Sequence, residues 1–506
     1  MSLLKVTQGY SATVFHLQLE NDYFDKLPGF YTQSLPDSAP EPNLLQFNAG
    51  LAEELGLDTD ALDSAQLGRM FSGNELPETA KPLAQAYAGH QFGGFVPQLG
   101  DGRALLLGEL VDAKGNLRDV ALKGSGPTPF SRGGDGKAAV GPVLREYLMG
   151  EAMHALGVPT TRALAAVATG ESVRRELPLP GAVLTRVASS HIRVGTFQFF
   201  AARQKYDQVR LLADYVVDRH YPELAEEETD RYLLLLRAVA EKQALLIANW
   251  MRVGFIHGVM NTDNMAIAGE TIDYGPCAFM ESYSAQTVFS SIDSGGRYAY
   301  GNQPMMAGWN LARFAETLLP LIDEADPERA VEAATEVIEG FVSRYEELWL
   351  VNMRAKMGLS GPSSEDEADR KIVQEWLELI EENQVDFTMA WRRLADAAEG
   401  NTDGVTDLFP SADLLQSFLE SWQSRLGESN AAETAQSMRA QNPIYIPRNH
   451  LIEEALAAAT ENGDLSLFER LLEVVSHPYE ERTGLESYAQ PAPPEFTACY
   501  KTFCGT

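Results

Sequence analysis

The chain has 506 residues, of which 45% are hydrophobic and 22% charged, so it has the size of a two-lobed or multidomain enzyme and an ordinary globular composition. This composition excludes a fibrous, collagen-like or wholly disordered protein. Its 72 acidic and 40 basic residues give a formal net charge of -32, which argues against nucleic acid as a partner, since most of the surface would repel it.

Targeting signals and the spacings typical of zinc sites are missing from the sequence. No apolar run reaches the roughly 18 residues that span a bilayer, and the polar N-terminus has no signal-peptide core. Three cysteines, Cys277, Cys499 and Cys504, are too few for a disulfide framework, and the eight histidines show no zinc-binding spacing. We therefore expect a cytoplasmic protein with no membrane partner, and a monomer by default.

In chain order, short helical patterns such as residues 48–57 come first, followed by a glycine-rich segment at 86–137 that is not net acidic. Apolar spacing predicts a helix over 138–157, which stops at Gly157, and a short buried strand over 182–187. The pattern after Val209 is mostly helical, over 233–251, 311–322, 330–357, 372–382 and 450–475. The sequence thus predicts a mixed α/β first third and a mainly helical remainder with acidic, solvated faces.

A glycine-rich hairpin is predicted around residues 100–123. Gly100, Gly102 and Arg103 precede a strand, a turn follows at 114–116, and the second strand ends at Lys123. Glycines allow a backbone to approach phosphates, and the order of loop, strand and lysine is typical of kinases. The alternative is an ordinary hairpin with a surface lysine. The dinucleotide fingerprint and the P-loop both fail, since Leu105 and Ser131 occupy required glycine slots.

Residues 124–137 contain five glycines and two cations, and they lead directly into the predicted helix at 138–157, whose N-terminus favours anions. We interpret this loop as a ligand contact rather than a flexible surface loop. The helix carries Glu146 and Glu151, and a kinase-like lysine needs a glutamate on the next helix to orient it. Glu146 is the preferred partner of Lys123, with Glu151 as the alternative.

The most specific motif runs from His257 to Asn264 and continues at Asp273-Tyr274-Gly275. Compared with kinase motifs, Asn264 falls on the metal-binding asparagine and Asp273 on the metal-binding aspartate, and their oxygens suit Mg²⁺ or Mn²⁺. The usual catalytic aspartate is replaced by Val259, whereas an acid stands at Asp263. The alternative is that these residues only form turns or a helix cap.

Arg186 lies near the end of the predicted strand at 182–187, and Arg193 follows that strand. Two arginines at the junction of two lobes could hold phosphate oxygens in a bidentate manner. Taken alone, they would be assigned to the surface.

These motifs together resemble the selenoprotein O family of protein adenylyltransferases, pseudokinases that lack the usual catalytic aspartate. The resemblance covers essentially the whole chain. Its strongest stretches are Tyr87-Ala88-Gly89-His90-Gln91-Phe92-Gly93, Gln98-Leu99-Gly100-Asp101-Gly102-Arg103, Leu122-Lys123-Gly124-Ser125-Gly126, His257 to Met265, and Tyr300-Gly301-Asn302-Gln303-Pro304.

The resemblance implies a protein-kinase-like, two-lobed α/β (α+β) fold with a largely helical C-terminal lobe. It implies four segments, namely an N-terminal extension at 1–85, an N-lobe at 86–190, a catalytic C-lobe at 191–320 and a helical region with a cysteine-containing tail at 321–506. It also implies an enzyme that binds ATP in a flipped orientation, transfers AMP to Ser, Thr or Tyr hydroxyls of protein substrates, and releases pyrophosphate.

The same resemblance implies the roles of individual residues. Asp263 would be the general base or at least the residue that positions the acceptor hydroxyl, and Asn264 and Asp273 would bind Mg²⁺ or Mn²⁺. The nucleotide contacts would be Gly100, Gly102, Arg103, Lys123, Asp135, Gly136, Glu146, Arg186, Arg193 and Asp273. It further raises the hypothesis that Cys277 forms a redox-sensitive disulfide with Cys499 or Cys504.

Two other functions fit the residues less well. A kinase that transfers the γ-phosphate to a protein or small molecule is disfavoured by Val259. A non-catalytic nucleotide-binding scaffold is disfavoured because both Asn264 and Asp273 are retained. The sequence leaves open whether ATP or UTP is the donor, which protein is modified, and which of the two metal ions is preferred.

Overall fold

The computed structural model describes residues 17–226, 229–427 and 430–503. Its centre is an antiparallel sheet with the strand order β1-β3-β6-β7-β10-β9-β2, and the short β8 pairs with β10. The strands of this sheet are β1 Tyr31–Gln33, β2 Asn43–Phe47, β3 Leu83–Gln85, β6 Ala104–Val111, β7 Leu117–Lys123, β8 Ala138–Ala139, β9 Arg162–Arg174 and β10 Pro178–Ala188. Residues 31–85 thus contribute three strands to the same sheet as the glycine-rich segment.

The predicted hairpin is confirmed as β6 and β7, with Ala104 opposite Lys123. Its turn is held by Asp112, whose Oδ1 accepts hydrogen bonds from the main-chain N–H groups of Lys114 and Asn116. The predicted strand at 182–187 is the centre of the longer β10, which pairs with β7 on one side and β9 on the other. This arrangement places Lys123 and Arg186 on neighbouring strands.

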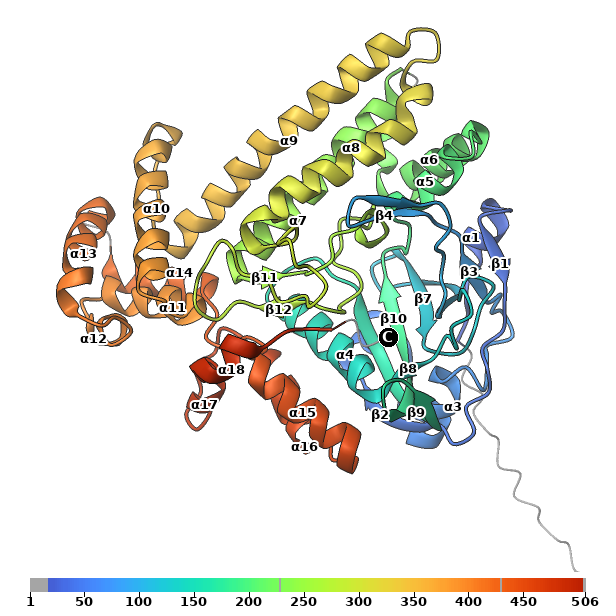
Figure 1. Cartoon of the computed structure of the whole chain (residues 1–506), viewed down its shortest axis with the longest axis horizontal. Helices are drawn as coiled ribbons and strands as arrows, with labels where there is room; N and C mark the ends of the chain where they lie inside the picture. Colours follow the sequence, from blue (N-terminus) through green and yellow to red (C-terminus); the bar gives the residue numbers. More distant parts are fainter. Residues whose placement is uncertain (1–16, 227–228, 428–429, 504–506) are drawn as a thin grey trace, which may run out of the picture.

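The predicted helix at 138–157 is confirmed as α4 Val140–Ala155, and Gly157 follows it with a φ of +75°. The helix packs against β9 and β10 and also against the C-terminal helices α15 Asn449–Asn462 and α16 Ser466–Val475. Because it is covered on both sides, polar residues such as Arg145 and Glu146 are also buried. Figure 1 shows α4 between the sheet and these two helices.

The remainder of the chain is mainly helical, as expected. The long helices α7 Arg231–Val253, α8 Gln303–Ile322 and α9 Pro327–Lys356 lie side by side (Figure 1). The other helices are α1 Asp22–Lys26, α2 Ala49–Glu54, α3 Ser64–Phe71, α5 Val194–Ala201, α6 Tyr206–His220, α10 Asp366–Glu382, α11 Phe387–Ala398, α12 Asp403–Thr406, α13 Ala412–Leu426, α14 Ala431–Gln441, α17 Glu486–Ala489 and α18 Pro494–Cys499. No helix in the described part of the chain has the length and apolarity needed to cross a membrane.

The helical pattern predicted over 450–475 is confirmed, and it forms two helices. α15 ends before Gly463, which has a φ of +67°, and α16 begins at Ser466. The glycine at this position allows the left-handed conformation that ends a helix. The fold as a whole is mixed α/β with a helical C-terminal part.

Between α7 and α8 the chain forms short elements rather than long ones. A two-stranded sheet of β11 Phe255–Ile256 and β12 Ala278–Phe279 brackets the loop that contains the most specific sequence motif. A second small sheet, β4 Gly89–Gln91 with β5 Gly94–Val96, packs on the short 3-10 helix Thr262–Asn264. The first sheet thus joins the two ends of the loop, and the second contacts its 3-10 helix.

Candidate active site

A cavity of about 1620 Å³ opens between the central sheet, α4 and the loop after β11. Every residue for which the sequence predicted a role in binding or catalysis lines this one cavity. They are Gly100, Gly102, Arg103, Lys123, Asp135, Gly136, Glu146, Arg186, Arg193, Asp263, Asn264 and Asp273. Segments separated by up to 173 positions in the sequence (residues 100 and 273) therefore meet at one place.

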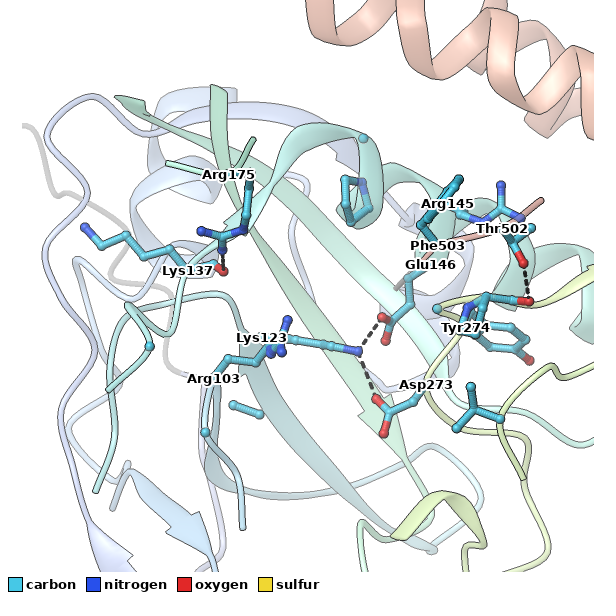
Figure 2. Close-up of a pocket in the computed structure, with 18 of the residues that line it drawn as sticks. Arg103, Lys123, Lys137, Arg145, Glu146, Arg175, Asp273, Tyr274, Thr502 and Phe503 are labelled. Carbon is cyan, nitrogen blue, oxygen red and sulfur yellow. Dashed lines mark hydrogen bonds and ion pairs between the residues drawn. The ribbon is translucent and has the colours of Figure 1, made fainter. Parts of the chain in front are cut away.

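The ion pair expected between Lys123 and Glu146 is present. The Nζ atom of Lys123, at the end of β7, lies 2.6 Å from Oε2 of Glu146 on α4 and 2.8 Å from Oδ1 of Asp273 (Figure 2). The alternative partner, Glu151, instead forms a two-pronged ion pair with Arg162, at 2.7 Å for each hydrogen bond. Glu146 is thus the glutamate that orients the lysine.

Arg186 and Arg193 are not surface residues, as they would be assigned when taken alone, because their side chains are only 3% and 2% exposed. Nη1 of Arg186 lies 2.6 Å from Oδ1 of Asp273 and 3.2 Å from Oε1 of Glu146. Nη1 of Arg193 donates to Oδ2 of Asp273 at 3.4 Å and to the main-chain oxygen of Asp263 at 3.1 Å. The charges of both buried arginines are compensated by the carboxylate of Asp273.

Asp273 is therefore surrounded by three cations. Burial alone would raise its pKa, but Lys123, Arg186 and Arg193 together hold the pKa of this carboxyl well below its usual range. Its backbone has a φ of +63°, a left-handed conformation that is uncommon for residues other than glycine. The carboxylate remains ionised and is fixed in position, as a metal ligand requires.

Asp263 lies in the 3-10 helix Thr262–Asn264 and differs from Asp273 in its environment. Burial raises the pKa of Asp263 to about 6. Its Oδ1 has no hydrogen-bond partner among the described residues, and Oδ2 is 3.4 Å from Nε2 of Gln91. The β4–β5 hairpin fixes the helix, since His90 donates its N–H to Oγ1 of Thr262 at 2.7 Å. A carboxylate with a raised pKa on the wall of the cavity is suited to accept a proton.

Asn264 and Asp273 provide two oxygen donors for a metal ion. Nδ2 of Asn264 donates to the main-chain oxygen of Val259 at 3.0 Å, which orients the amide and leaves its Oδ1 as an acceptor. The described part of the chain contains no cluster of three or more His, Cys, Asp or Glu residues that could bind a metal by itself. Two oxygens fit Mg²⁺ or Mn²⁺ that is held mainly by phosphates and water.

The predicted glycines are needed where two loops pack together. Gly100 has a φ of +83°, and a Cβ atom there would lie 2.9 Å from Cβ of Phe130. A Cβ atom at Gly136 would lie 2.5 Å from N of Pro127. The loop at residues 100–103 is therefore folded closely against the loop at residues 124–137, and both line the cavity.

The remaining predicted contacts lie toward the rim. Arg103 forms no ion pair with any residue in the described ranges, so its charge is uncompensated within the cavity wall (Figure 2). Asp135 is 42% exposed and is engaged by Arg175, whose Nη1 lies 2.8 Å from Oδ2. Lys137 on the same loop pairs with Glu171 at 2.6 Å.

The C-terminal tail closes one side of the cavity. Oγ1 of Thr502 donates to the main-chain oxygen of Pro276 at 2.7 Å, and the N–H of Thr502 donates to Phe289 at 2.9 Å. Cys277 is buried and Cys499 exposed, and both are free thiols. Cys504, the other proposed partner of Cys277, lies outside the described residues. Only the family resemblance indicated that the tail contacts this site.

Several residues that shape the site were missed. Gly89 and Gln91 contact Asp263, and they lie in a motif used for the resemblance without being given a role. His191 and Asp119 are buried beside Arg186, and nothing in their local sequence distinguishes them. Only their positions could have indicated them, since Asp119 lies four residues before Lys123 and His191 lies five residues after Arg186.

Comparison with known proteins agrees with this geometry. Residues 13–476 match the profile of the family described as protein adenylyltransferase SelO. The chain is 59% identical over 482 residues to the protein nucleotidyltransferase YdiU of Chromobacterium violaceum, covering 95% of this chain and 100% of that protein. It is 59% identical over 490 residues to YdiU of Cereibacter sphaeroides (97% and 99% covered) and 56% identical over 493 residues to YdiU of Rhizobium johnstonii (96% and 97% covered).

Proposed function

This chain belongs to the SelO family of protein adenylyltransferases, and we propose that it transfers AMP from ATP to hydroxyl side chains of proteins, with release of pyrophosphate. The observation that carries the proposal is the convergence of Lys123, Arg186 and Arg193 on Asp273, with Asp263 on the wall of the same cavity. In a chain with a net charge of -32, a buried group of cations is what a polyphosphate would require.

We further propose that the chain has a protein-kinase-like arrangement. The ion pair between Lys123 on a strand and Glu146 on the next helix supports it, as does the loop that carries Asn264 and Asp273. In this arrangement residues 86–190 form the N-lobe and residues 191–320 the catalytic C-lobe. Residues 1–85 and 321–506 are the extensions on either side.

The cations hold and orient the triphosphate in this mechanism. Arg103 is available for phosphate because it has no ion-pair partner among the described residues. Lys123, Arg186 and Arg193 form a fixed cationic wall that compensates the charge accumulating on pyrophosphate as it leaves. Because these side chains are already held by Glu146 and Asp273, they do not need to reorganise during the reaction.

Asp263 takes the proton in the chemical step. The hydroxyl oxygen of the acceptor attacks the α-phosphorus, the bond between that phosphorus and the bridging oxygen to the β-phosphate breaks, and the hydroxyl proton passes to Asp263. The position that bears the base in kinases is Val259, which cannot accept a proton. An acid at residue 263 supports a nucleotide bound in the flipped orientation, with the α-phosphate toward the acceptor.

Asn264 and Asp273 would hold a divalent metal, together with phosphate oxygens. Mg²⁺ or Mn²⁺ at these residues would supply further neutralisation of phosphate charge. Both residues line the cavity. The residues themselves keep the site in place, since Asn264 is oriented by Val259 and Asp273 by Lys123 and Arg186.

The experiment uses ATP labelled separately at the α- and γ-phosphorus, with Mg²⁺ or Mn²⁺ and a generic protein acceptor. Protein-bound label from the α position only is the expected result, and it should disappear in Asp263→Asn and Asp273→Asn. Label from the γ position only would mean a kinase instead. ATP binding without transfer of either label would mean a nucleotide-binding scaffold. Competition by UTP would show whether the enzyme selects the nucleobase of the donor.

A further inference from the structure

A row of buried side chains runs from the candidate active site into the sheet behind it. Nε of Arg186 lies 3.1 Å from Nε2 of His191, and Nδ1 of His191 lies 2.9 Å from Oδ2 of Asp119. Oδ1 of Asp119 in turn accepts a hydrogen bond from Nη2 of Arg219 at 2.6 Å. The side chains of Asp119 and His191 are 0% and 3% exposed. Of the four residues in this row, only Arg186 has been assigned a role in transfer.

The partners of His191 determine which of its nitrogens carries the proton. Arg219 is a permanent cation, and its ion pair keeps Asp119 ionised, so the carboxylate can only accept a hydrogen bond. Burial, together with Arg186, lowers the pKa of His191, so the ring is neutral. The single ring proton must therefore be on Nδ1, facing Asp119, and Nε2 must be an acceptor for the N–H of Arg186.

This acceptor matters because the guanidinium of Arg186 is planar and rigid. Once Nε is bound to His191, the direction of Nη1 is fixed, and it is the atom that contacts both Glu146 and Asp273. Without an acceptor, a buried N–H would be left unpaired, and the arginine would gain by turning toward another partner. The main-chain oxygen of His191 also accepts a hydrogen bond from Nε of Arg193, at 3.2 Å.

We propose that His191 is a positioning residue for nucleotide transfer, which acts by holding Arg186, and that Asp119 sets the tautomer it needs. The inference rests on the proposed function, because Arg186 is assigned there to the triphosphate. It does not require His191 to contact ATP. A positioning role of this kind predicts that the effect of His191 on activity passes entirely through Arg186.

The test compares four variants with the wild-type enzyme, using AMP transfer from α-labelled ATP: His191→Phe, His191→Gln, Arg186→Ala and the double variant of His191→Phe with Arg186→Ala. His191→Phe keeps the ring volume but removes the acceptor, so kcat/KM should fall by about 10- to 100-fold, as expected for a misplaced catalytic group. His191→Gln places an amide oxygen near the position of Nε2, so activity should stay within about threefold of wild type. His191→Phe should cause no further loss in an Arg186→Ala background, because coupled residues are not additive.

Two kinetic results would overturn the inference. One is equal activity of His191→Phe and wild type, and the other is a full additional loss when His191→Phe is combined with Arg186→Ala. Absence of transfer by the wild-type enzyme would instead reject the proposed function. A readout independent of activity and of the stability of any variant is the two-bond ¹H–¹⁵N correlation pattern of the His191 ring in the wild-type protein. A proton on Nδ1 is expected, and a proton on Nε2 would contradict the proposal.

Discussion

Gly89 and Asp263 are in such close contact that no larger residue fits at position 89. A Cβ atom added to Gly89 would lie 2.9 Å from Cγ of Asp263 and still closer to its Oδ1. The first strand of the β4–β5 hairpin thus forms the wall against which the proposed base rests. Gly89 has no unusual backbone conformation, so the glycine is needed for space alone.

Gly89→Ala should therefore displace the carboxylate of Asp263 and lower AMP transfer while the fold stays intact. We expect a fall in kcat of about 10- to 100-fold, since a misplacement of about 1 Å can cost 10²-fold. Gly94→Ala, in the same hairpin, is the matched control because its added Cβ would meet only the main-chain oxygen of Gln91 at 3.4 Å. Steady-state kinetics with α-labelled ATP measures both, and equal rates would show that Asp263 does not depend on this contact.

The sequence predicted the composition of the site well but not its supporting residues. Lys123, Glu146, Asn264 and Asp273 could be recognised because motif order and spacing carry the information. The burial of Arg186 could not, since it depends on Asp273, 87 positions away. His191 and Asp119 were missed for the same reason, because their contact spans 72 positions and neither belongs to a local pattern.

The fold shows the same division between local and distant signals. Helix α4 and the β6–β7 hairpin follow from periodicity and turn residues. Strand β9 was not predicted, because its first half is an apolar, alanine-rich run that is buried on both faces and has no alternation. The break between α15 and α16 depends on one glycine, Gly463, in a segment whose helical pattern otherwise continues.

Lys123→Ala should reduce transfer strongly without unfolding the protein. The lysine side chain is 17% exposed, and Arg186 would still contact both Glu146 and Asp273 after its loss. We expect kcat/KM to fall by about 10²- to 10³-fold, as for removal of one preorganised charge. Lys114→Ala, at the exposed turn of the same hairpin, should keep wild-type kinetics. Loss of the native circular dichroism spectrum in Lys123→Ala would mean that the lysine is structural.

The two described cysteines should differ sharply in reactivity. Cys499 is exposed, whereas Cys277 is fully buried and burial raises the pKa of its thiol to about 12. Iodoacetamide at pH 8 should therefore modify Cys499 in the native protein and reach Cys277 only after denaturation, as followed by peptide mapping. Thr502→Val removes the hydrogen bond to Pro276 and should speed the labelling of Cys277. Rapid modification of Cys277 in the native wild type would contradict this burial.

Glu109 should make the stability of the protein depend on pH. Its side chain is 0% exposed and accepts the N–H groups of Asp22 and Tyr23 at 3.0 and 2.9 Å. Burial, and after it the nearby Asp119, raise the pKa of Glu109 to about 7. Because this value exceeds that of the unfolded chain, the native state binds the proton more tightly. The resulting stabilisation is complete below about pH 4.5 and is lost as the pH rises through about 7.

Glu109→Gln keeps an oxygen acceptor for the two N–H groups but carries no charge at any pH. The free energy of unfolding of this variant, relative to wild type, should therefore increase between pH 5 and pH 8, by about 2 to 3 kcal/mol. Urea unfolding at several pH values measures the difference. A difference that stays constant over this range would mean that Glu109 is already ionised at pH 5, with Arg219, 3.7 Å away, compensating its charge more fully than its burial indicates.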